Sequence, residues 1–584
     1  MTEKIFRVRL FVFLVTVMIM LCGCGAGTTN TANSKNSIIA DAKTSEEMPS
    51  STVAEEASEA EEAELADKYE RTIPEPADSF AGGDGSEESP YQISNAEELY
   101  RFSYIMDASN FSLQDEEYGE VFRDKYYVIT DDIVVNDVSD YEVWTESAPQ
   151  NGWKPINTFE GHLDGGGHVI TGLYSYSPTE ANRVVNGGLI ENLWTGASVE
   201  NLTLEKCFII VSSDGAYTGG IAGSTYNATV KNCHVTGTVL GGVSTGGIVG
   251  DTSDSQVYDC TFDGFVEGNL SGGGIAGNAY GSIIENCEVS GEINGKPAGG
   301  IAGGLSSRNS ILEVSAEFEE IVKKGIGIKN CINNATVYSK EAEAGGIVGA
   351  AAEGLDGENR TEVLISECVN YGNVTSEGGS LTGNAGGICA YLTSSPQLIG
   401  ENRIVGTWRI LNCNNEGAVY TTEGGLGGIL GYANTKGGLL EISGCSNNGE
   451  VSTDGWSALG GVVGGVACFE GVELRLESLE NTANLKASAD RTTGGIAGSL
   501  TVVESEENEA AFYIKNCRNT GDIEAEDYAI YGGIVGDFLP GIDADDFGGT
   551  FEMENCSCKD GVQTVGAYGS LLERYVKMIE SIEE

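Results

Sequence analysis

Between residues 187 and 560 the apolar positions of the chain recur in a repeated unit that begins with two glycines. In a degenerate first copy at Gly187 the glycines are followed by Leu189. In the other copies Ile or Val follows, with Gly or once Ala two residues later. Ten copies begin at Gly219, Gly246, Gly273, Gly299, Gly345, Gly386, Gly427, Gly460, Gly494 and Gly532. The first four start 27, 27 and 26 residues apart, which is too long for a hairpin and fits one three-strand coil of a solenoid. The repeat therefore predicts an all-β fold, a right-handed parallel β-helix.

Within each unit the alternation of apolar and polar residues slips once, next to an asparagine. In a representative copy, Ile284, Cys287 and Val289 can all face inward only if the chain bends at Asn286. Asparagine tolerates the left-handed backbone conformation that such a bend needs, and stacked asparagines can hydrogen-bond from coil to coil. The predicted bend ladder consists of Asn232, Asp259, Asn286, Asn330, Asn412, Asn481, Asn516 and Asn555.

A cysteine follows nearly every bend. The predicted structural ladder consists of Cys233, Cys260, Cys287, Cys331, Cys368, Cys413, Cys445, Cys517 and Cys556. One copy breaks the rule, because Asn481-Thr482 stands where Asn-Cys is expected. Neighbouring coils lie about 4.8 Å apart, but parallel side-chain vectors make disulfide geometry poor. We therefore expect a buried ladder of small apolar side chains, with a few chance disulfides as the alternative.

Insertions concentrate at one corner of the coil. From the end of the Gly-Gly unit to the bend the chain takes nine residues in the first three coils and 13 to 27 in the later ones. From the cysteine to the next Gly-Gly unit the spacing stays between 12 and 18 residues. Stacking would place the inserted loops on one edge of the solenoid, and such an edge often is the binding face. The alternative is simple tolerance of surface loops.

The first 24 residues have the pattern of an export signal. Basic residues precede an apolar run, Leu10 to Leu21, that is too short to span a bilayer. The run leads to Gly23-Cys24, which resembles the lipobox of bacterial lipoproteins. The resemblance makes Cys24 the expected lipidation site and implies anchoring on the outer face of a membrane in a bacterial cell envelope. Cleavage without a lipid is the alternative.

Residues 25–79, poor in aromatics and rich in Ser, Thr, Ala and Glu, predict a disordered acidic linker.

Two segments flank the repeats, and both are expected to cover an open end of the solenoid. Residues 80–186 predict a small N-terminal α/β cap, and residues 561–584 predict a capping helix that begins at Ser570. The elements expected in the N-terminal cap are a strand at Tyr91–Ile93, a capping box at Ser94–Glu97, a helix to Met106, a strand at Tyr126–Val135, and a strand-turn-strand at Phe159–Leu173.

The charge balance limits the partners. Lysine and arginine number 32 against 88 aspartates and glutamates, so the net charge is −56. Such a surface repels nucleic acid and anionic lipid head groups, which excludes both as partners. The chain would then meet a membrane only through its N-terminal lipid. Acidic groups can attract divalent cations or basic partners, but they also simply keep a protein soluble.

The repeated Gly-Gly-Ile/Val-x-Gly units resemble the GLUG repeats of bacterial surface proteins, with Ile or Val in place of the Leu that names the motif. Such repeats occur in adhesin-like proteins and beside some immunoglobulin A-cleaving metallopeptidases. The resemblance covers residues 187–560, and Phe159–Leu173 resembles the segment that commonly precedes these repeats. It implies cell-surface display and adhesion or binding of an extracellular glycan or protein, and it supplies no catalytic residues.

Few residues suggest metal chemistry. The chain has three histidines, and none begins a His-Glu-x-x-His zinc motif. His162 and His168 flank one glycine turn without a third ligand in sight, so we expect them to shape the turn. Residues 543–548 space their aspartates like a Ca²⁺ loop with Glu554 at the twelfth position, but Phe547 stands where a ligand is needed. No cofactor is therefore expected, with Ca²⁺ as the alternative.

A parallel β-helix is also the fold of polysaccharide lyases and hydrolases, which use converging carboxylates and a basic residue. Here carboxylates are too abundant for any pair to be informative, and basic residues do not cluster. Trp408 could serve as a sugar platform, but counting back from inward Ile410 points it into the core. The sequence therefore favours a lipid-anchored surface binding or adhesion protein, with a β-helix carbohydrate-active enzyme as the alternative.

Overall fold

The computed structural model describes residues 68–107, 121–177, 185–213, 215–307, 326–352, 362–379, 383–394, 397–399, 402–404, 406–469, 471–487, 492–503, 510–525, 530–539, 549–559 and 562–566. The chain divides into two units, Met1–Ala60 and Glu61–Glu584, and all of these residues belong to the second. The predicted signal segment with Cys24, the loop at 543–548 and the helix from Ser570 lie outside the described residues.

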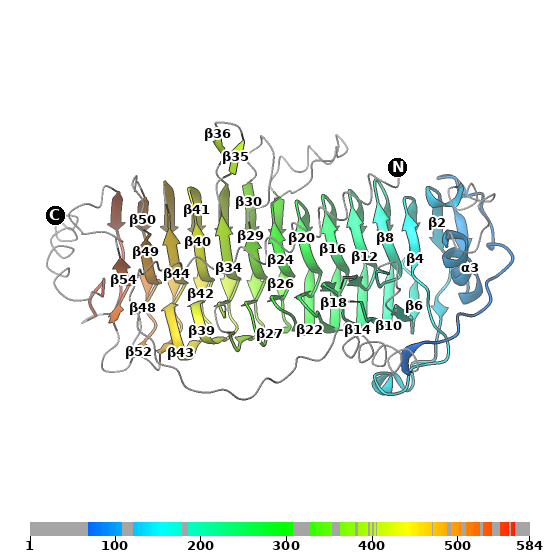
Figure 1. The fold of residues 1–584 in the computed structure, drawn as a ribbon, viewed down its shortest axis with the longest axis horizontal. Helices are drawn as coiled ribbons and strands as arrows, with labels where there is room; N and C mark the ends of the chain where they lie inside the picture. The colour runs from blue at the N-terminus through cyan, green and yellow to red at the C-terminus, as the bar shows by residue number, and fades with distance from the viewer. Residues whose placement is uncertain are drawn as a thin grey trace, which may run out of the picture. The chain divides into compact units, whose positions relative to one another are not determined.

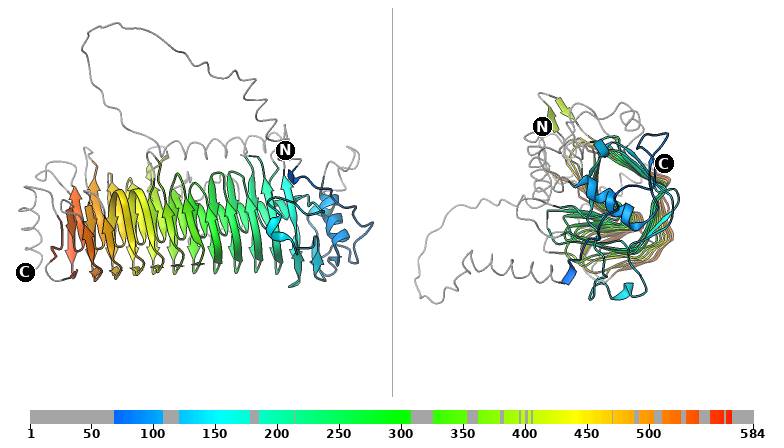
Figure 2. Two further views of the ribbon diagram at one scale, coloured as in Figure 1. Left: turned by 90° about the horizontal axis from the view of Figure 1, so that it is seen from below. Right: turned by 90° about the vertical axis from the view of Figure 1, so that its right-hand side faces the viewer.

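The described part of the second unit is a parallel β-helix in which successive coils add strands to three sheets, as predicted (Figure 1). Neighbouring coils pair in register: Ala222 pairs with Val249, and Val249 with Ala276. Figure 2 shows the coils following one another from cyan to orange along the β-helix. In sheets 1 and 2 the coils repeat this pairing without register shifts, so equivalent residues of the repeat form straight rows along these sheets.

The glycine pair leads into sheet 1. Its strands are β4 (Ile156–Phe159), β8 (Ile190–Trp194), β12 (Ala222–Tyr226), β16 (Val249–Ser253), β20 (Ala276–Tyr280), β24 (Ala302–Ser306), β29 (Val348–Ala352), β34 (Cys389–Ser394), β40 (Leu430–Thr435), β44 (Val463–Cys468), β49 (Ala497–Val502) and β54 (Val535–Leu539).

Sheet 2 precedes the bend. Its strands are β1 (Tyr91–Ile93), β2 (Tyr126–Ile129), β5 (His162–Asp164), β9 (Ser198–Glu200), β13 (Thr229–Lys231), β17 (Gln256–Tyr258), β21 (Ile283–Glu285), β25 (Ile326–Lys329), β30 (Glu362–Ser366), β37 (Thr407–Leu411), β41 (Gly438–Ser443), β45 (Val472–Glu477), β50 (Ala511–Lys515) and β55 (Thr550–Glu554).

Sheet 3 runs from the bend to the next glycine pair. The strands that follow the bend are β3 (Ile133–Val134), β6 (Val169–Thr171), β7 (Tyr174–Ser177), β10 (Thr203–Val211), β14 (His234–Leu240), β18 (Thr261–Glu267), β22 (Glu288–Asn294), β26 (Ile332–Asn333), β27 (Thr336–Ser339), β31 (Val369–Asn370), β32 (Val374–Ser376), β38 (Asn414–Asn415), β39 (Val419–Gly427), β42 (Ser446–Asn447), β43 (Val451–Gly460), β46 (Glu480–Asn481), β47 (Leu485–Ala487), β51 (Arg518–Asn519) and β52 (Ile523–Ala525). Short strands that end in the glycine pair are β11 (Tyr217–Gly219), β15 (Ser244–Gly246), β19 (Ser271–Gly273), β23 (Ala298–Gly299), β28 (Ala344–Gly345), β33 (Ala385–Gly386), β48 (Thr492–Gly494) and β53 (Ile530–Gly532).

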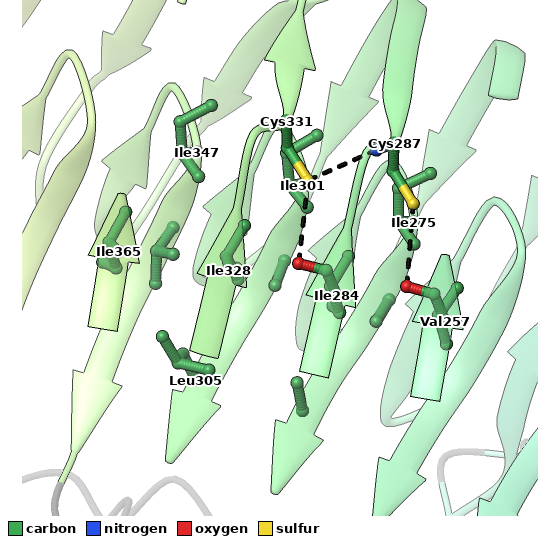
Figure 3. Close-up of a cluster of buried hydrophobic side chains, with 14 of the residues drawn as sticks. Val257, Ile275, Ile284, Cys287, Ile301, Leu305, Ile328, Cys331, Ile347 and Ile365 are labelled. Atoms are coloured by element: carbon green, nitrogen blue, oxygen red, sulfur yellow. Dashed lines mark hydrogen bonds between the residues drawn. The ribbon is translucent and has the colours of Figure 1, made fainter. Parts of the chain in front are cut away.

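The core is a continuous stack of apolar rows inside the coils. Figure 3 shows one section, in which Ile284 and Cys287 of one coil pack beside Ile328 and Cys331 of the next. These side chains are at most 1% exposed. Burying an aliphatic side chain of this size stabilises the fold by roughly 1.5–3 kcal/mol, and the stack repeats that gain in every coil. Trp408 is 2% exposed and belongs to the same core, as predicted.

The bend between sheets 2 and 3 has the left-handed conformation that the repeat predicts. Seven predicted members of the bend ladder have φ between 49° and 57°: Asn232, Asp259, Asn286, Asn330, Asn412, Asn516 and Asn555. Asn201, Glu367 and Ser478, which the sequence analysis did not single out, also have φ of 56° or 57°.

The structure contradicts the prediction for Asn481. That residue lies two positions inside sheet 3, in β46, and Ser478 takes the bend. Leu479, 1% exposed, fills the place that a cysteine fills in the other coils. In this coil Ser478-Leu479 therefore takes the place of the Asn-Cys pair, and Asn481-Thr482 does not.

At the N-terminal side, helix α3 (Ala96–Met106) ends where predicted, but its cap lies one residue further along the chain. Asn95 is the cap, because its Oδ1 accepts a hydrogen bond from the Glu98 N–H at 3.0 Å. The Glu98 carboxylate accepts in turn from the Ser94 N–H at 2.7 Å. Leu99 and Phe102 of this helix are buried in the core of the β-helix.

The parallel coils begin before the predicted boundary at residue 187. Strands β4, β5 and β6 already pair in parallel with β8, β9 and β10. The strand expected at Tyr126–Val135 is divided into β2 and β3, which belong to different sheets.

The predicted linker also ends earlier than residue 79: Tyr69 is 8% exposed and packs with Trp144, Tyr174 and Phe208. No helix in the described part of the chain is long and apolar enough to cross a membrane.

Candidate functional site

The predicted binding edge lies at the corner between sheets 1 and 2. In an early coil, β20 ends at Tyr280 and β21 begins at Ile283, whereas β24 ends at Ser306 and β25 begins only at Ile326. The antiparallel pair β35 (Gln397–Ile399) and β36 (Asn402–Ile404) stands at this corner next to β30 (Figure 1). Most other inserted residues lie outside the described part of the chain.

The cysteine ladder lies inside the β-helix. Its members from Cys233 to Cys517 are at most 1% exposed, and Cys556 is half-buried. The Cys331 thiol donates to the Lys329 carbonyl at 3.2 Å and faces the Ile284 carbonyl of the preceding coil at 3.8 Å. Every cysteine that the structure describes is a free thiol.

Two further cysteines, Cys389 and Cys468, are buried in sheet 1 and were not singled out from the sequence. Burial raises the pKa of each thiol to about 12. A thiol with such a pKa stays protonated at neutral pH and is a poor nucleophile and metal ligand. These thiols contribute volume to the core rather than chemistry.

The bend asparagines form a partly exposed hydrogen-bonded row along the outside of the bend. Asn232 donates to Asn201 Oδ1 at 2.9 Å, and Asn330 donates to Asn286 Oδ1 at 2.8 Å. Asn286 donates to Asp259 Oδ1 at 3.0 Å, so the row accommodates a carboxylate as an acceptor. Because these amides satisfy one another, the row is a structural feature of the coil.

The histidines do not come together. His162 Nδ1 lies 2.9 Å from Ser198 Oγ, whereas His168 Nδ1 lies 3.1 Å from Asp132 Oδ1. His234 Nδ1 contacts Thr261 Oγ1 at 2.8 Å. Over the residues that the structure describes, no group of three or more His, Cys, Asp or Glu side chains is arranged to hold a metal ion.

Several basic side chains on the outer face of the coils are held by carboxylates. Arg409 on β37 bridges Glu362 and Glu441 of the two neighbouring coils at 2.5 and 2.8 Å. Lys515 lies 3.3 Å from both Glu552 and Glu554. These pairs reduce the repulsion between stacked carboxylates in a strongly acidic protein, since opposite charges on adjacent strands attract.

A row of outward positions on sheet 1 has a different character. The first and fourth residues of its strands are buried, in most coils as part of the hydrophobic core, whereas the third residue is not part of that core. We call the row of third residues the outer strip; it consists of Thr158, Asn192, Ser224, Asp251, Asn278, Gly304, Ala350, Tyr391, Tyr432, Gly465, Ser499 and Asp537. From Ser224 on, each member directly follows a Gly-Gly unit in the sequence, which is the signal that could have identified it.

In its first half the outer strip is polar and tied to the adjacent strands of sheet 3. Ser224 and Asn186 both donate to Asn192 Oδ1, at 2.9 and 3.0 Å. Asn278 donates to Ser244 Oγ at 2.9 Å, and that hydroxyl donates to a backbone carbonyl. The side chains are thus fixed in orientation.

Asp251 stands in this polar half and is only 8% exposed. Ser253 Oγ lies 3.4 Å from its Oδ1, a weak hydrogen bond. Burial raises the pKa of Asp251 from 3.8 to about 7, because the charged form loses its hydration. The carboxyl group therefore changes its charge close to neutral pH.

In its second half the outer strip carries two aromatic side chains in consecutive coils. The rings of Tyr391 and Tyr432 are stacked, with centroids 6.5 Å apart and planes inclined by 5°. Both residues are partly exposed. Glu343 and Asn384, each 8% exposed, precede the short strands β28 and β33 of the adjacent sheet 3. This cluster combines an apolar ring surface with a carboxylate and an amide.

Comparison with known protein families matches residues 214–240 to the GLUG motif. The stretch contains the Gly-Gly unit at Gly219 and the ladder residue Cys233. The predicted GLUG resemblance is confirmed there, and the other copies repeat the same coil in the structure.

Two curated proteins are similar to part of the chain. It is 38% identical over 124 residues to "Halomucin" of Haloquadratum walsbyi, which covers 20% of this chain and 1% of that protein. It is 30% identical over 152 residues to a "Putative Gly-rich membrane protein" of Evansella cellulosilytica, which covers 25% of this chain and 14% of that protein. The chain therefore spans only a small part of these relatives.

Among solved structures, the "putative immunoglobulin A1 protease" from Bacteroides ovatus aligns with 57% of this chain and 86% of that chain. The sequence identity is 17% and the TM-score is 0.34.

Proposed function

We propose that the chain is a lipid-anchored protein of a bacterial cell surface whose β-helix binds an extracellular glycan. The observation that carries the proposal is the outer strip of sheet 1, where polar and aromatic side chains stand in one row along the coils. Sugar-binding sites combine ring surfaces with a few fixed polar groups, and the strip offers both.

The surface location is supported by the GLUG motif at 214–240 and by relatives whose names refer to a mucin and to a membrane protein. The lipobox-like Gly23-Cys24 supports attachment through a lipid on Cys24. A protein with a net charge of −56 would stay away from anionic lipid head groups, so the acyl chains would supply the attachment.

Two experiments test the proposal. Metabolic labelling with a radioactive fatty acid should mark the full chain, and the Cys24→Ser variant should lose the label and leave the membrane fraction. A glycan array probed with the purified full chain, with and without Ca²⁺, should give binding to intact glycans. Label on the Cys24→Ser variant would refute the lipid site.

The array also separates binding from catalysis. Chromatography of each bound glycan should recover it at its original length. Shortened or unsaturated products would replace the binding function with that of a carbohydrate-active enzyme, and absence of binding to every glycan would refute the glycan as the ligand.

A further inference from the structure

We infer that Tyr391, Tyr432, Glu343 and Asn384 form a subsite for a neutral pyranose sugar within a glycan chain. The inference rests on the proposed function and specifies where on the β-helix the ligand binds and what its chemistry is. The tyrosines come from β34 and β40, and Glu343 and Asn384 directly precede β28 and β33, which contact β34 and β40.

The two tyrosines supply the apolar surface. The two rings belong to consecutive coils, with their centroids 6.5 Å apart and their planes inclined by 5°, so the aromatic surface continues from one coil to the next. Gly465 occupies the same position in the next coil, and a Cβ there would lie 2.9 Å from Tyr432 Cδ2. Glycine at 465 therefore leaves the room that the Tyr432 ring uses.

The neighbouring positions of the outer strip are small. Ala350 precedes Tyr391 in the row, and Gly465 follows Tyr432. Two aromatic side chains flanked by small ones form a short platform, and the C–H face of a pyranose ring is an apolar surface that an aromatic ring can pack against. A linear glycan would lie parallel to the row.

Asn384 supplies a polar group of fixed orientation. Its Oδ1 accepts a hydrogen bond from the Gly425 N–H at 2.7 Å, and its side chain also hydrogen-bonds to Glu343. With the oxygen occupied by a backbone donor, the amide nitrogen is directed to acceptors such as the Glu343 carboxylate or a sugar hydroxyl.

Glu343 supplies the acceptor. Burial raises the pKa of this carboxyl group, and the hydrogen bond from Asn384 opposes that rise. Glu343 directly precedes β28, and β28 lies against β34, the strand that carries Tyr391. A buried carboxylate gains from a hydroxyl donor, because it has lost most of its water.

The charge of the protein selects the class of sugar. A net charge of −56 and a carboxylate inside the subsite both disfavour uronic acids and sulfated sugars. Neutral hexoses have hydroxyl groups that can donate to Glu343 without charge repulsion. The predicted ligand is therefore a neutral polysaccharide and not an acidic one.

The test is isothermal titration of the full chain with soluble mannan, xyloglucan, galactomannan and laminarin, and with polygalacturonate as the acidic probe. At least one neutral probe should bind, and polygalacturonate should not. The Tyr391→Ala and Tyr432→Ala variants should each lose about tenfold or more in affinity for the bound probe. Glu343→Gln should lose less, because the amide keeps an acceptor.

Matched variants keep the test interpretable. Tyr371→Ala removes a tyrosine that is 54% exposed between β31 and β32, and it should leave the affinity within about twofold. Tyr391→Phe keeps the ring and should retain most of the binding. Thermal melting of each variant identifies any that fails to fold. If Tyr391→Ala does not fold, the affinity of Tyr391→Phe still tests whether the aromatic ring is sufficient for binding without the hydroxyl group.

The outcomes separate the two levels of the claim. If the parent binds a neutral probe and the folded alanine variants bind equally well, the subsite is wrong while the glycan function stands. Binding of polygalacturonate instead would overturn the neutral class. If the parent binds no probe here and no glycan on the array, both the subsite and the proposed function fail.

Discussion

The side-chain amide of Asn447 donates a hydrogen bond to Oδ1 of Asn481 in the next coil, at 2.9 Å. It also donates to the Gly449 carbonyl at 3.1 Å, and Asn415 donates to Asn447 Oδ1 at 2.8 Å. The same bonds repeat along a second, buried asparagine ladder, which consists of Asn333, Asn370, Asn415, Asn447, Asn481 and Asn519. Asn481 therefore belongs to this inner ladder and not to the bend.

Asn447→Ala should destabilise the β-helix by about 2–4 kcal/mol, because it leaves the amide of Asn415 and the oxygen of Asn481 without their buried partner. The change is read as a lower midpoint of chemical denaturation. Asn448→Ala is the control, since Asn448 makes an exposed bond to Glu416 and should cost less than about 1 kcal/mol. Equal midpoints for the two variants would refute the role of the ladder.

Gly461→Ala should be destabilising for a related reason. A Cβ at this second glycine of the pair would lie 2.7 Å from Asn481 Nδ2 and would also meet the Gly495 carbonyl. The coil would have to shift against two rigid neighbours, a cost of roughly 1–3 kcal/mol. A melting temperature equal to that of the parent protein would show that the coils have more room than the structure gives them.

Cys287→Asp should prevent the β-helix from folding as a whole, because it puts a carboxylate among apolar side chains at a position that is 1% exposed. Cys287→Ala is the matched variant and should cost only about 1–2 kcal/mol, since it removes one sulfur atom from the stack. Circular dichroism with temperature distinguishes the two. A melting curve of Cys287→Asp that matches the parent would contradict the inward position.

Asp251→Asn should change how stability depends on pH. The folded pKa of about 7 lies above the ordinary value of 3.8, so the folded state binds the proton more tightly. The stability that this group contributes is complete below pH about 4, declines as the pH rises to about 7, and stays lost above that value. The variant should therefore match the parent near pH 4 and be more stable by about 2–4 kcal/mol at pH 8.

The reciprocal variant checks the cause. Asn278 occupies the outer strip in the next coil and is also 8% exposed. Asn278→Asp should acquire a decline in stability between about pH 4 and pH 7. If Asp251→Asn and the parent protein keep a constant difference in melting temperature across this range, the carboxyl group is not desolvated.

Much of the fold could be predicted from the sequence, because a β-helix repeats one solution in every coil. The backbone of each coil requires a glycine where neighbouring strands approach closely, as at Gly246, and a residue that tolerates a left-handed conformation at the bend, as at Asn286. These residues therefore recur in the sequence. The prediction that Asn481 forms a bend was wrong for a physical reason. Leu479 fills the core position that a cysteine fills in the other coils, so this coil lacks the cysteine by which the bend is recognised in the sequence.

The candidate site was less accessible to sequence reasoning. Tyr391 and Tyr432 come together only through the register of β34 and β40, and insertions of varying length separate them in the chain. Glu343 and Asn384 precede different glycine pairs and carry no motif of their own. The burial that raises the pKa of Asp251 arises from packing in the folded β-helix, and the alternation of apolar and polar residues in the sequence does not reveal it.

The in-register pairing of Gly246 with Gly273 has a consequence for how the length of this protein can change. Removal of residues 247–273 would join Gly246 to Gly274, and the new junction would have the same backbone geometry as the old one. Duplication of that stretch would work in the same way. The gene can therefore gain or lose whole coils by recombination between repeats, whereas the loss of a single codon inside a coil would turn inward-facing side chains outward.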